Sequence, residues 1–207
     1  AITTAAFTLL GGQLSDRLGS QRMFTSGMLL FFFGALVCTF SPNVSFLIAG
    51  RTMQGIGAAI YAPSSLAMVL LRFHKTHHPL AIGIWAASVP IGSALSPTFA
   101  SLILEIADWR WMFAVQTIGA AAVVIAIALH KTKEISAEII NTGSLDILGI
   151  PIGTAAIGCL ALGIVQGPRW GWMSWGTILA FIASATLFPI FLHRNKGQPV
   201  PLIDFKL

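Results

Sequence analysis

Long apolar runs without a charged side chain limit what this chain can fold into more than any other feature of its sequence. A helix needs about 20 mostly apolar residues to cross a hydrocarbon core about 30 Å thick. Runs of this kind lie at 23–40, 52–71, 79–104, 111–129, 147–168 and 170–192. They are continuously apolar and lack the alternation of barrel strands. Only 9% of the 207 residues are charged, so we predict an all-α membrane protein.

The first stretch, residues 1–15, is also apolar, but it is too short to cross a membrane by itself. The chain begins without a methionine, so we interpret it as a piece of a longer protein that starts within a spanning helix. We predict no signal peptide, because no basic leader and no small-residue cleavage site accompany this stretch.

The basic residues gather on alternate connections between the apolar runs. One side receives Arg17, Arg22, Arg72, Lys75, Lys131, Lys133, Arg194, Lys196 and Lys206, and the other receives Arg110 and Arg169. The positive-inside rule makes the richer side cytoplasmic. Every tryptophan except Trp85 lies at one of the two outer connections, as expected of an interfacial aromatic belt. The net charge of +5 therefore reflects membrane orientation, and we expect no nucleic-acid partner.

A polar cluster interrupts the apolar sequence at GGQLSDRLGSQR, residues 11–22. Its distinctive members are Gly12, Asp16, Arg17, Gly19 and Arg22. We predict a tight reversal between two spanning helices, with Gly19 in a positive-φ conformation. Asp16 would pair with a helix N-terminus or a nearby arginine and form a cytoplasmic latch. The alternative is a solvated loop that obeys the positive-inside rule, which explains the arginines but not the aspartate.

A second polar cluster, Arg51 and Gln54, lies within the next spanning helix. Arg51 is about 10 Å below the start of that helix at a rise of 1.5 Å per residue, where a charge is costly unless it faces a partner or a watery cavity. Gln54 lies on the same face, and Gly55 begins a stripe of small residues suited to close helix packing. The alternative is an arginine that extends to the outer interface.

The run at 79–104 carries small residues at four-residue spacing and two internal prolines. The small residues are Ser88, Gly92, Ser96 and Ala100, and the prolines are Pro90 and Pro97. Such a ridge admits a second helix at close range, and the prolines favour a bend. The alternative is an ordinary well-packed helix.

Together these motifs resemble those of the major facilitator superfamily. The cluster at 11–22 resembles the signature of its second cytoplasmic turn, and RTMQG at 51–55 resembles its fourth-span RxxQG motif. Gly92, Ser96, Pro97 and Ala100 resemble its fifth-span antiporter motif, GxxxGPxxGG, with small residues replacing three glycines. WRWMF at 109–113 and PVPLI at 199–203 are similar to the fourteen-span drug:proton antiporter family. The resemblance covers nearly the whole chain.

The resemblance implies a partial major-facilitator-type helical bundle, from span two to span eight. Residues 1–130 would belong to the N-terminal six-helix bundle without its first span. Residues 131–146 would form a cytoplasmic link, 147–193 an extra pair of spanning helices, and 194–207 a cytoplasmic tail. A multi-pass protein of the plasma (inner) membrane is expected.

The resemblance also implies a proton-coupled secondary transporter that exports small drug-like or amphipathic compounds by alternating access. Its partners would be the lipid bilayer, the substrate, protons and the remainder of the same chain. In this scheme Arg51 takes part in proton coupling, and Gly92 with Pro97 shapes a bending helix. None of the 7 Asp and Glu lies deep in an apolar run, and the resemblance places the usual carboxylate in the first span. An uptake or metabolite-exchange transporter and a non-transporting membrane sensor or scaffold remain alternatives.

Enzymatic and metal chemistry receive little support from the sequence. There is no GxxxxGK[ST] phosphate-binding loop, and no Ser-His-Asp or Cys-His group stands in polar surroundings. His74, His77 and His78 have a spacing that can bind a metal, but no cysteine or carboxylate accompanies them. We therefore predict no enzyme, no metal site and no cofactor.

Overall fold

The structure, a computed structural model, describes residues 2–129 and 149–196. These residues form seven α-helices and one short 3-10 helix, and they contain no strand. The elements are α1 (Ile2–Leu18), α2 (Ser20–Thr39), α3 (Val44–Arg72), η1 (Lys75–His77), α4 (His78–Ile106), α5 (Arg110–Leu129), α6 (Gly149–Trp170) and α7 (Trp175–Lys196). The prediction of an all-α protein is confirmed.

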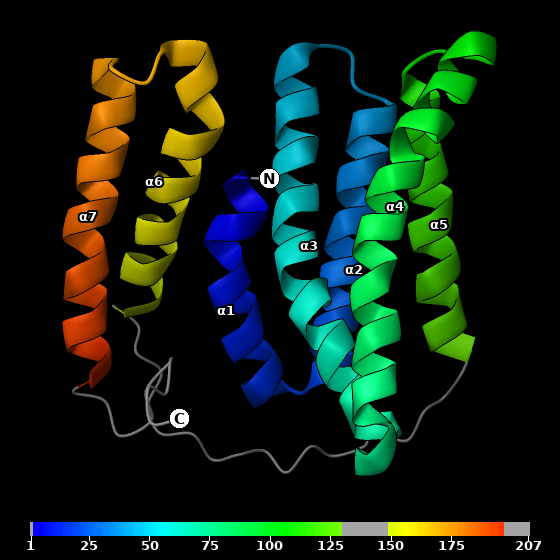
Figure 1. Cartoon of the computed structure of the whole chain (residues 1–207). Helices are drawn as coiled ribbons and strands as arrows, with labels where there is room; N and C mark the ends of the chain where they lie inside the picture. Colours follow the sequence, from blue (N-terminus) through cyan, green and yellow to red (C-terminus); the bar gives the residue numbers. More distant parts are fainter. Residues whose placement is uncertain (1, 130–148, 197–207) are drawn as a thin grey trace.

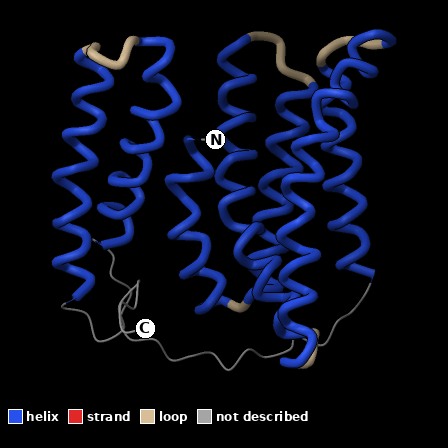
Figure 2. Tube along the Cα trace, in the orientation of Figure 1, coloured by secondary structure: helices blue, strands red, loops and turns tan. Residues whose placement is uncertain are grey.

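Six helices of the described part are long and apolar enough to cross a membrane. They are α2 to α7, while α1 has only 17 residues. Figure 1 shows the helices running side by side, so that the connections alternate between two ends. The α2–α3, α4–α5 and α6–α7 connections share one end, and the α1–α2 and α3–α4 connections share the other (Figure 2). This alternation agrees with the predicted alternation of the connections, and the assignment of one end to the cytoplasm stays a prediction.

Helices α2 and α3 pack backbone against backbone. A Cβ atom added to Gly27 would lie 2.7 Å from the Tyr61 amide nitrogen, and one added to Gly34 would lie 2.8 Å from the Gly50 carbonyl oxygen. Small residues permit this approach, because helix association in lipid depends on close packing and hydrogen bonds rather than on the hydrophobic effect. Helices α2 and α3 are thus the most closely packed pair among the described helices.

Helix α1 lies between this pair and the last two helices. It packs against α3, where a Cβ atom added to Gly55 would lie 2.8 Å from the Cβ atom of Thr3. On its other side α1 packs against α6, which in turn pairs with α7 (Figure 1). Helix α7 continues to Lys196, past residue 193 where the sequence predicted its end.

Helix α4 has little contact with the other described helices. Ala81 is its only buried residue among those described. A hydrogen bond attaches it to α3, because Trp85 Nε1 donates to Ser65 Oγ at 3.0 Å. The helix is continuous through Pro90 and Pro97.

The reversal predicted at residues 11–22 is much shorter than expected. Helix α1 continues through Asp16 and Arg17 to Leu18, and α2 begins at Ser20, so only Gly19 lies outside the two helices. The charged residues stay helical because a residue at a helix end reaches the membrane surface without leaving the helix, and Arg17 in the last turn suits the helix dipole. Gly19 has a φ of 91°, which confirms the predicted positive φ.

Candidate functional site

A polar cluster joins helices α2, α3 and α5 among apolar surroundings. Arg51 Nη1 donates to Gln54 Oε1 at 3.2 Å, and Gln54 Nε2 donates to Gln116 Oε1 at 2.9 Å. Cys38 Sγ lies 3.8 Å from Gln54 Oε1, at the range of a weak sulfur hydrogen bond. Gln54 is therefore the centre of the cluster, with one partner on each of the three helices.

The position of Gln54 follows from the packing of α2 on α3. Its side chain is only 3% exposed, and a Cβ atom added to Gly34 would lie 3.0 Å from its Cγ atom. A buried side-chain amide without hydrogen-bond partners would lower the stability of the protein by about 1–3 kcal/mol. The hydrogen bonds to Arg51 and Gln116 remove that penalty on both ends of the amide.

Arg51 lies between α3 and α5 and remains exposed. Its Cζ atom is 5.6 Å from the ring centroid of Phe113 on α5. A guanidinium over an aromatic ring gains a cation–π attraction, so Phe113 and Gln54 hold the charge from two sides. An exposed guanidinium held in this way can bind a carboxylate or another anion, because all of its hydrogen-bonding groups are donors.

The sequence predicted part of this cluster. Arg51 and Gln54 lie together as predicted, whereas Gly55 faces Thr3 of α1 and serves helix packing. Gln116, Phe113 and Cys38 were not predicted from the sequence as members of the cluster. A signal for Gln116 was present, because an amide inside the apolar run at 111–129 needs a polar partner.

The predicted latch residues surround the α1–α2 connection. Gly12 lies inside α1, and an added Cβ atom would have no neighbour within 4 Å. Arg17 is half-buried and Arg22 is exposed. The side chain of Asp16 lies outside the described part of the structure, so its pairing stays a prediction.

The residues of the predicted antiporter motif lie on α4, apart from the polar cluster. Gly92, Ser96 and Pro97 are exposed and Ala100 is half-buried. A Cβ atom added to Gly92 would have no neighbour within 4 Å, so no described helix packs against the ridge at that point.

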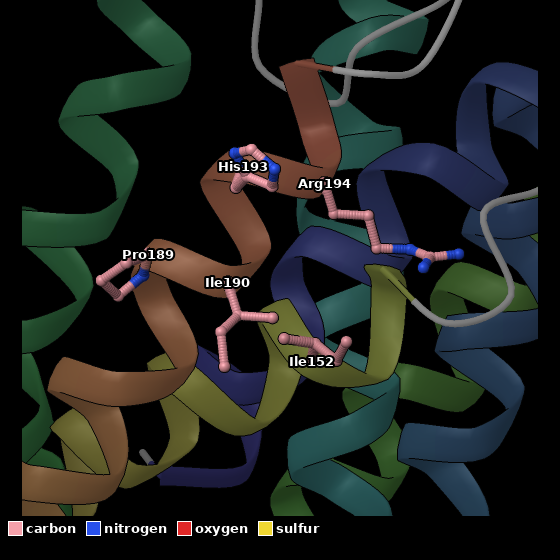
Figure 3. A pocket seen from close by; sticks show the side chains of 5 residues that line it. All are labelled: Ile152, Pro189, Ile190, His193 and Arg194. Carbon is pink, nitrogen blue, oxygen red and sulfur yellow. The ribbon is translucent and has the colours of Figure 1, made fainter.

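A cavity of about 530 Å³ lies between α6 and α7, near the end where α7 finishes. Figure 3 shows Ile152 and Ile190 side by side, with His193 and Arg194 pointing to different sides. Pro189 completes the lining. The cavity is formed by helices other than those of the polar cluster, and its walls are mainly apolar.

No group of three or more His, Cys, Asp or Glu with metal-binding geometry occurs within residues 2–129 and 149–196. In the turn around η1, His74 Nδ1 bonds to Thr76 Oγ1 at 3.1 Å and His78 Nε2 bonds to the Phe73 carbonyl oxygen at 3.0 Å. These rings are therefore engaged in local contacts.

Comparison with known proteins yields one family and several curated relatives. Residues 1–196 match the sequence model of the Major Facilitator Superfamily. The methylenomycin A resistance protein of Bacillus subtilis is 34% identical over all of this chain and 44% of its own length. The multidrug resistance protein Stp of Mycobacterium tuberculosis is 30% identical over 98% of this chain and 37% of its own. The tetracenomycin C resistance and export protein of Streptomyces glaucescens is 29% identical over all of this chain and 38% of its own. The chain thus spans less than half the length of these relatives.

Proposed function

The chain belongs to the major facilitator superfamily, and from that premise we propose that the complete protein exports small drug-like or amphipathic compounds in exchange for protons. The superfamily consists of membrane transporters rather than enzymes, and the six spanning helices make this chain part of a multi-pass membrane protein. The relatives named for drug resistance and export direct the proposal towards efflux. Export from the cell requires the plasma membrane, and we place the protein there.

The observation that carries the proposal is the position of Arg51. Arg51 lies about 10 Å inside the outer end of α3, and a charged side chain within a spanning helix is costly against lipid, so such residues mark substrate or proton pathways. Gln54 and Phe113 contact the Arg51 guanidinium and hold it in place. Its exposure leaves it available to a group that changes charge during transport.

Proton coupling then follows from electrostatics. An ionised carboxylate elsewhere in the complete protein would pair with Arg51, and protonation would abolish the pair. Loss of the pair would shift the balance between inward-open and outward-open states. In this mechanism Asp16, Arg17 and Arg22 latch the cytoplasmic side, and α4 bends near Gly92 and Pro97.

The domain arrangement forms part of the same proposal. Residues 1–130 contribute helices to the N-terminal bundle, and 147–193 form an added pair joined through a cytoplasmic link at 131–146. The packing of α6 on both α7 and α1 supports an added pair beside that bundle. The link itself and residues 197–207 lie outside the described part of the structure.

The test uses the full-length protein in proteoliposomes with an imposed pH gradient and ethidium as the transported probe. Arg51→Ala is compared with Arg110→Ala, because Arg110 also pairs with an aromatic ring, Trp109, at 4.5 Å, but lies at the outer end of α5. We expect the Arg51 variant to lose gradient-driven transport and the Arg110 variant to keep it. Nigericin, which collapses the gradient, should stop transport by the wild type.

Other outcomes select the alternatives. Ethidium transport that persists without a gradient would favour an uptake or exchange carrier. Absence of transport for ethidium and for a panel of other amphipathic cations would favour a sensor or scaffold. Full activity of Arg51→Ala would remove Arg51 from the coupling mechanism.

A further inference from the structure

The orientation of the Gln54 amide is decided by its two partners. A guanidinium has donors and no acceptor, so Gln54 can bond to Arg51 only through its oxygen, as the 3.2 Å contact shows. The amide NH2 group must then point the other way, towards α5. Because Gln54 is only 3% exposed, that group needs a protein acceptor.

Gln116 provides the acceptor. Its Oε1 atom lies 2.9 Å from Gln54 Nε2, within the usual range of an N–H···O hydrogen bond. If Gln116 presented its own NH2 group instead, Gln54 would have to turn its oxygen towards α5 and its NH2 group towards Arg51. The N–H donors of Gln54 and of Arg51 would then face each other. The Gln54 oxygen can therefore face Arg51 only while Gln116 presents an acceptor to the Gln54 NH2 group.

We infer that Gln116 is a positioning residue for Arg51, acting through the orientation of Gln54. This inference rests on the proposed transport function and adds a residue of α5 to it. Gln116 does not touch the Arg51 guanidinium in any contact that the structure shows. Its effect on transport therefore depends on its acceptor oxygen rather than on the volume of its side chain.

Two variants of similar length separate the acceptor from the volume. Gln116→Glu keeps an acceptor oxygen, and Gln116→Met fills the same space without one. The loss of one buried hydrogen bond with its donor left unpaired corresponds to about a tenfold change in an equilibrium. We expect Gln116→Met to lower the rate of gradient-driven ethidium export about tenfold and Gln116→Glu to retain most of that rate.

A purely structural role predicts the opposite order. A carboxylate placed in an apolar layer lowers stability more than a methionine does, so Gln116→Glu would be the less active variant if transport followed stability. Thermal unfolding of both variants in detergent measures this directly. If Gln116→Glu is less stable but more active than Gln116→Met, the result supports the positioning role. If the activities of the two variants follow their unfolding temperatures, the result overturns it.

A second readout does not depend on transport. Cys38 is fully buried and its Sγ atom lies 3.8 Å from Gln54 Oε1, so displacement of Gln54 should open the thiol to N-ethylmaleimide. In full-length protein whose other cysteines are serine, we expect Gln116→Met to speed alkylation of Cys38 about tenfold. The matched control is Thr117→Val, because Thr117 Oγ1 bonds to Thr39 on α2 at 3.5 Å and not to Gln54.

The two readouts separate the inference from the proposed function. Unchanged alkylation of Cys38 in Gln116→Met, or equal acceleration in Thr117→Val, overturns the inference even if the wild type exports ethidium. Faster alkylation in a protein that transports nothing would retain the positioning of Gln54 and reject the transport function. Faster alkylation with normal export would show that Gln116 has no part in transport.

Discussion

Replacement of Gly34 by alanine tests whether the α2–α3 contact sets the position of Gln54. The added Cβ atom would lie 2.8 Å from the backbone nitrogen of Gln54 and 2.8 Å from the Gly50 carbonyl oxygen. Both neighbours are backbone atoms, so no side chain can rotate away. The two helices must separate by about 0.6 Å to reach an ordinary contact of 3.4 Å.

The energetic cost and the effect on the site follow from this movement. Overpacking of this size costs about 1–3 kcal/mol. If α3 moves away from α2, the Gln54–Gln116 hydrogen bond lengthens from 2.9 Å towards about 3.5 Å, beyond the normal range. Gly34→Ala should therefore lower both the stability and the transport rate.

Gly27→Ala is the matched control. Its Cβ atom would lie 2.7 Å from the Tyr61 nitrogen and 2.9 Å from the Gly57 oxygen, at the same helix interface but away from Gln54. Unfolding free energies from titration with sodium dodecyl sulfate should fall by a similar amount in both variants. Ethidium export should fall further in Gly34→Ala. Equal transport losses in the two variants would refute the link between this contact and the site.

Three further predictions concern the turns and the hydrogen bonds that join neighbouring helices. Gly19→Ala should cost about 1–3 kcal/mol in unfolding free energy, because its φ of 91° strains any residue with a side chain. The control Gly12→Ala, inside α1, should be neutral or stabilising by up to about 1 kcal/mol. Equal effects of the two substitutions would contradict the positive φ at Gly19. Trp85→Phe should cost about 0.6 kcal/mol by removing the bond to Ser65. Ser65→Ala also removes the bond from Ser65 Oγ to the Ala62 carbonyl oxygen at 2.7 Å, so it should cost less in the Trp85→Phe variant than in the wild type; additive losses in a double-mutant cycle would reject the Trp85–Ser65 bond. Arg110→Ala removes a bond to the Ser41 carbonyl oxygen in the α2–α3 connection, at 3.1 Å, and should lower the thermal unfolding temperature without changing the dependence of export on the pH gradient.

The helices could be predicted from the sequence because each one is specified locally. An apolar run of about 20 residues must satisfy its backbone within itself in lipid, and a helix does so without any tertiary partner. The runs at 23–40 and 111–129 accordingly became α2 (Ser20–Thr39) and α5 (Arg110–Leu129). Boundaries were less certain at the first connection, where charge suggested a longer loop than the single residue Gly19.

The site illustrates the limit of the same reasoning. The spacing of three residues was sufficient to predict that Arg51 and Gln54 share a helix face. Gln116 lies 62 positions along the chain from Gln54, and no local pattern fixes which face of α5 turns towards α3.

The sequence alone determined the order of the spans, the end of the bundle at which most basic residues gather, and the presence of a charge inside the third helix, since apolarity and charge act on each segment separately. The tertiary structure decided which helices touch, and it did so through the glycines that let α2 and α3 approach and through the buried amide that required an acceptor on α5. Close packing and hydrogen bonding depend on atoms distant in sequence meeting at a few ångströms, so their partners are defined only when the helices are assembled.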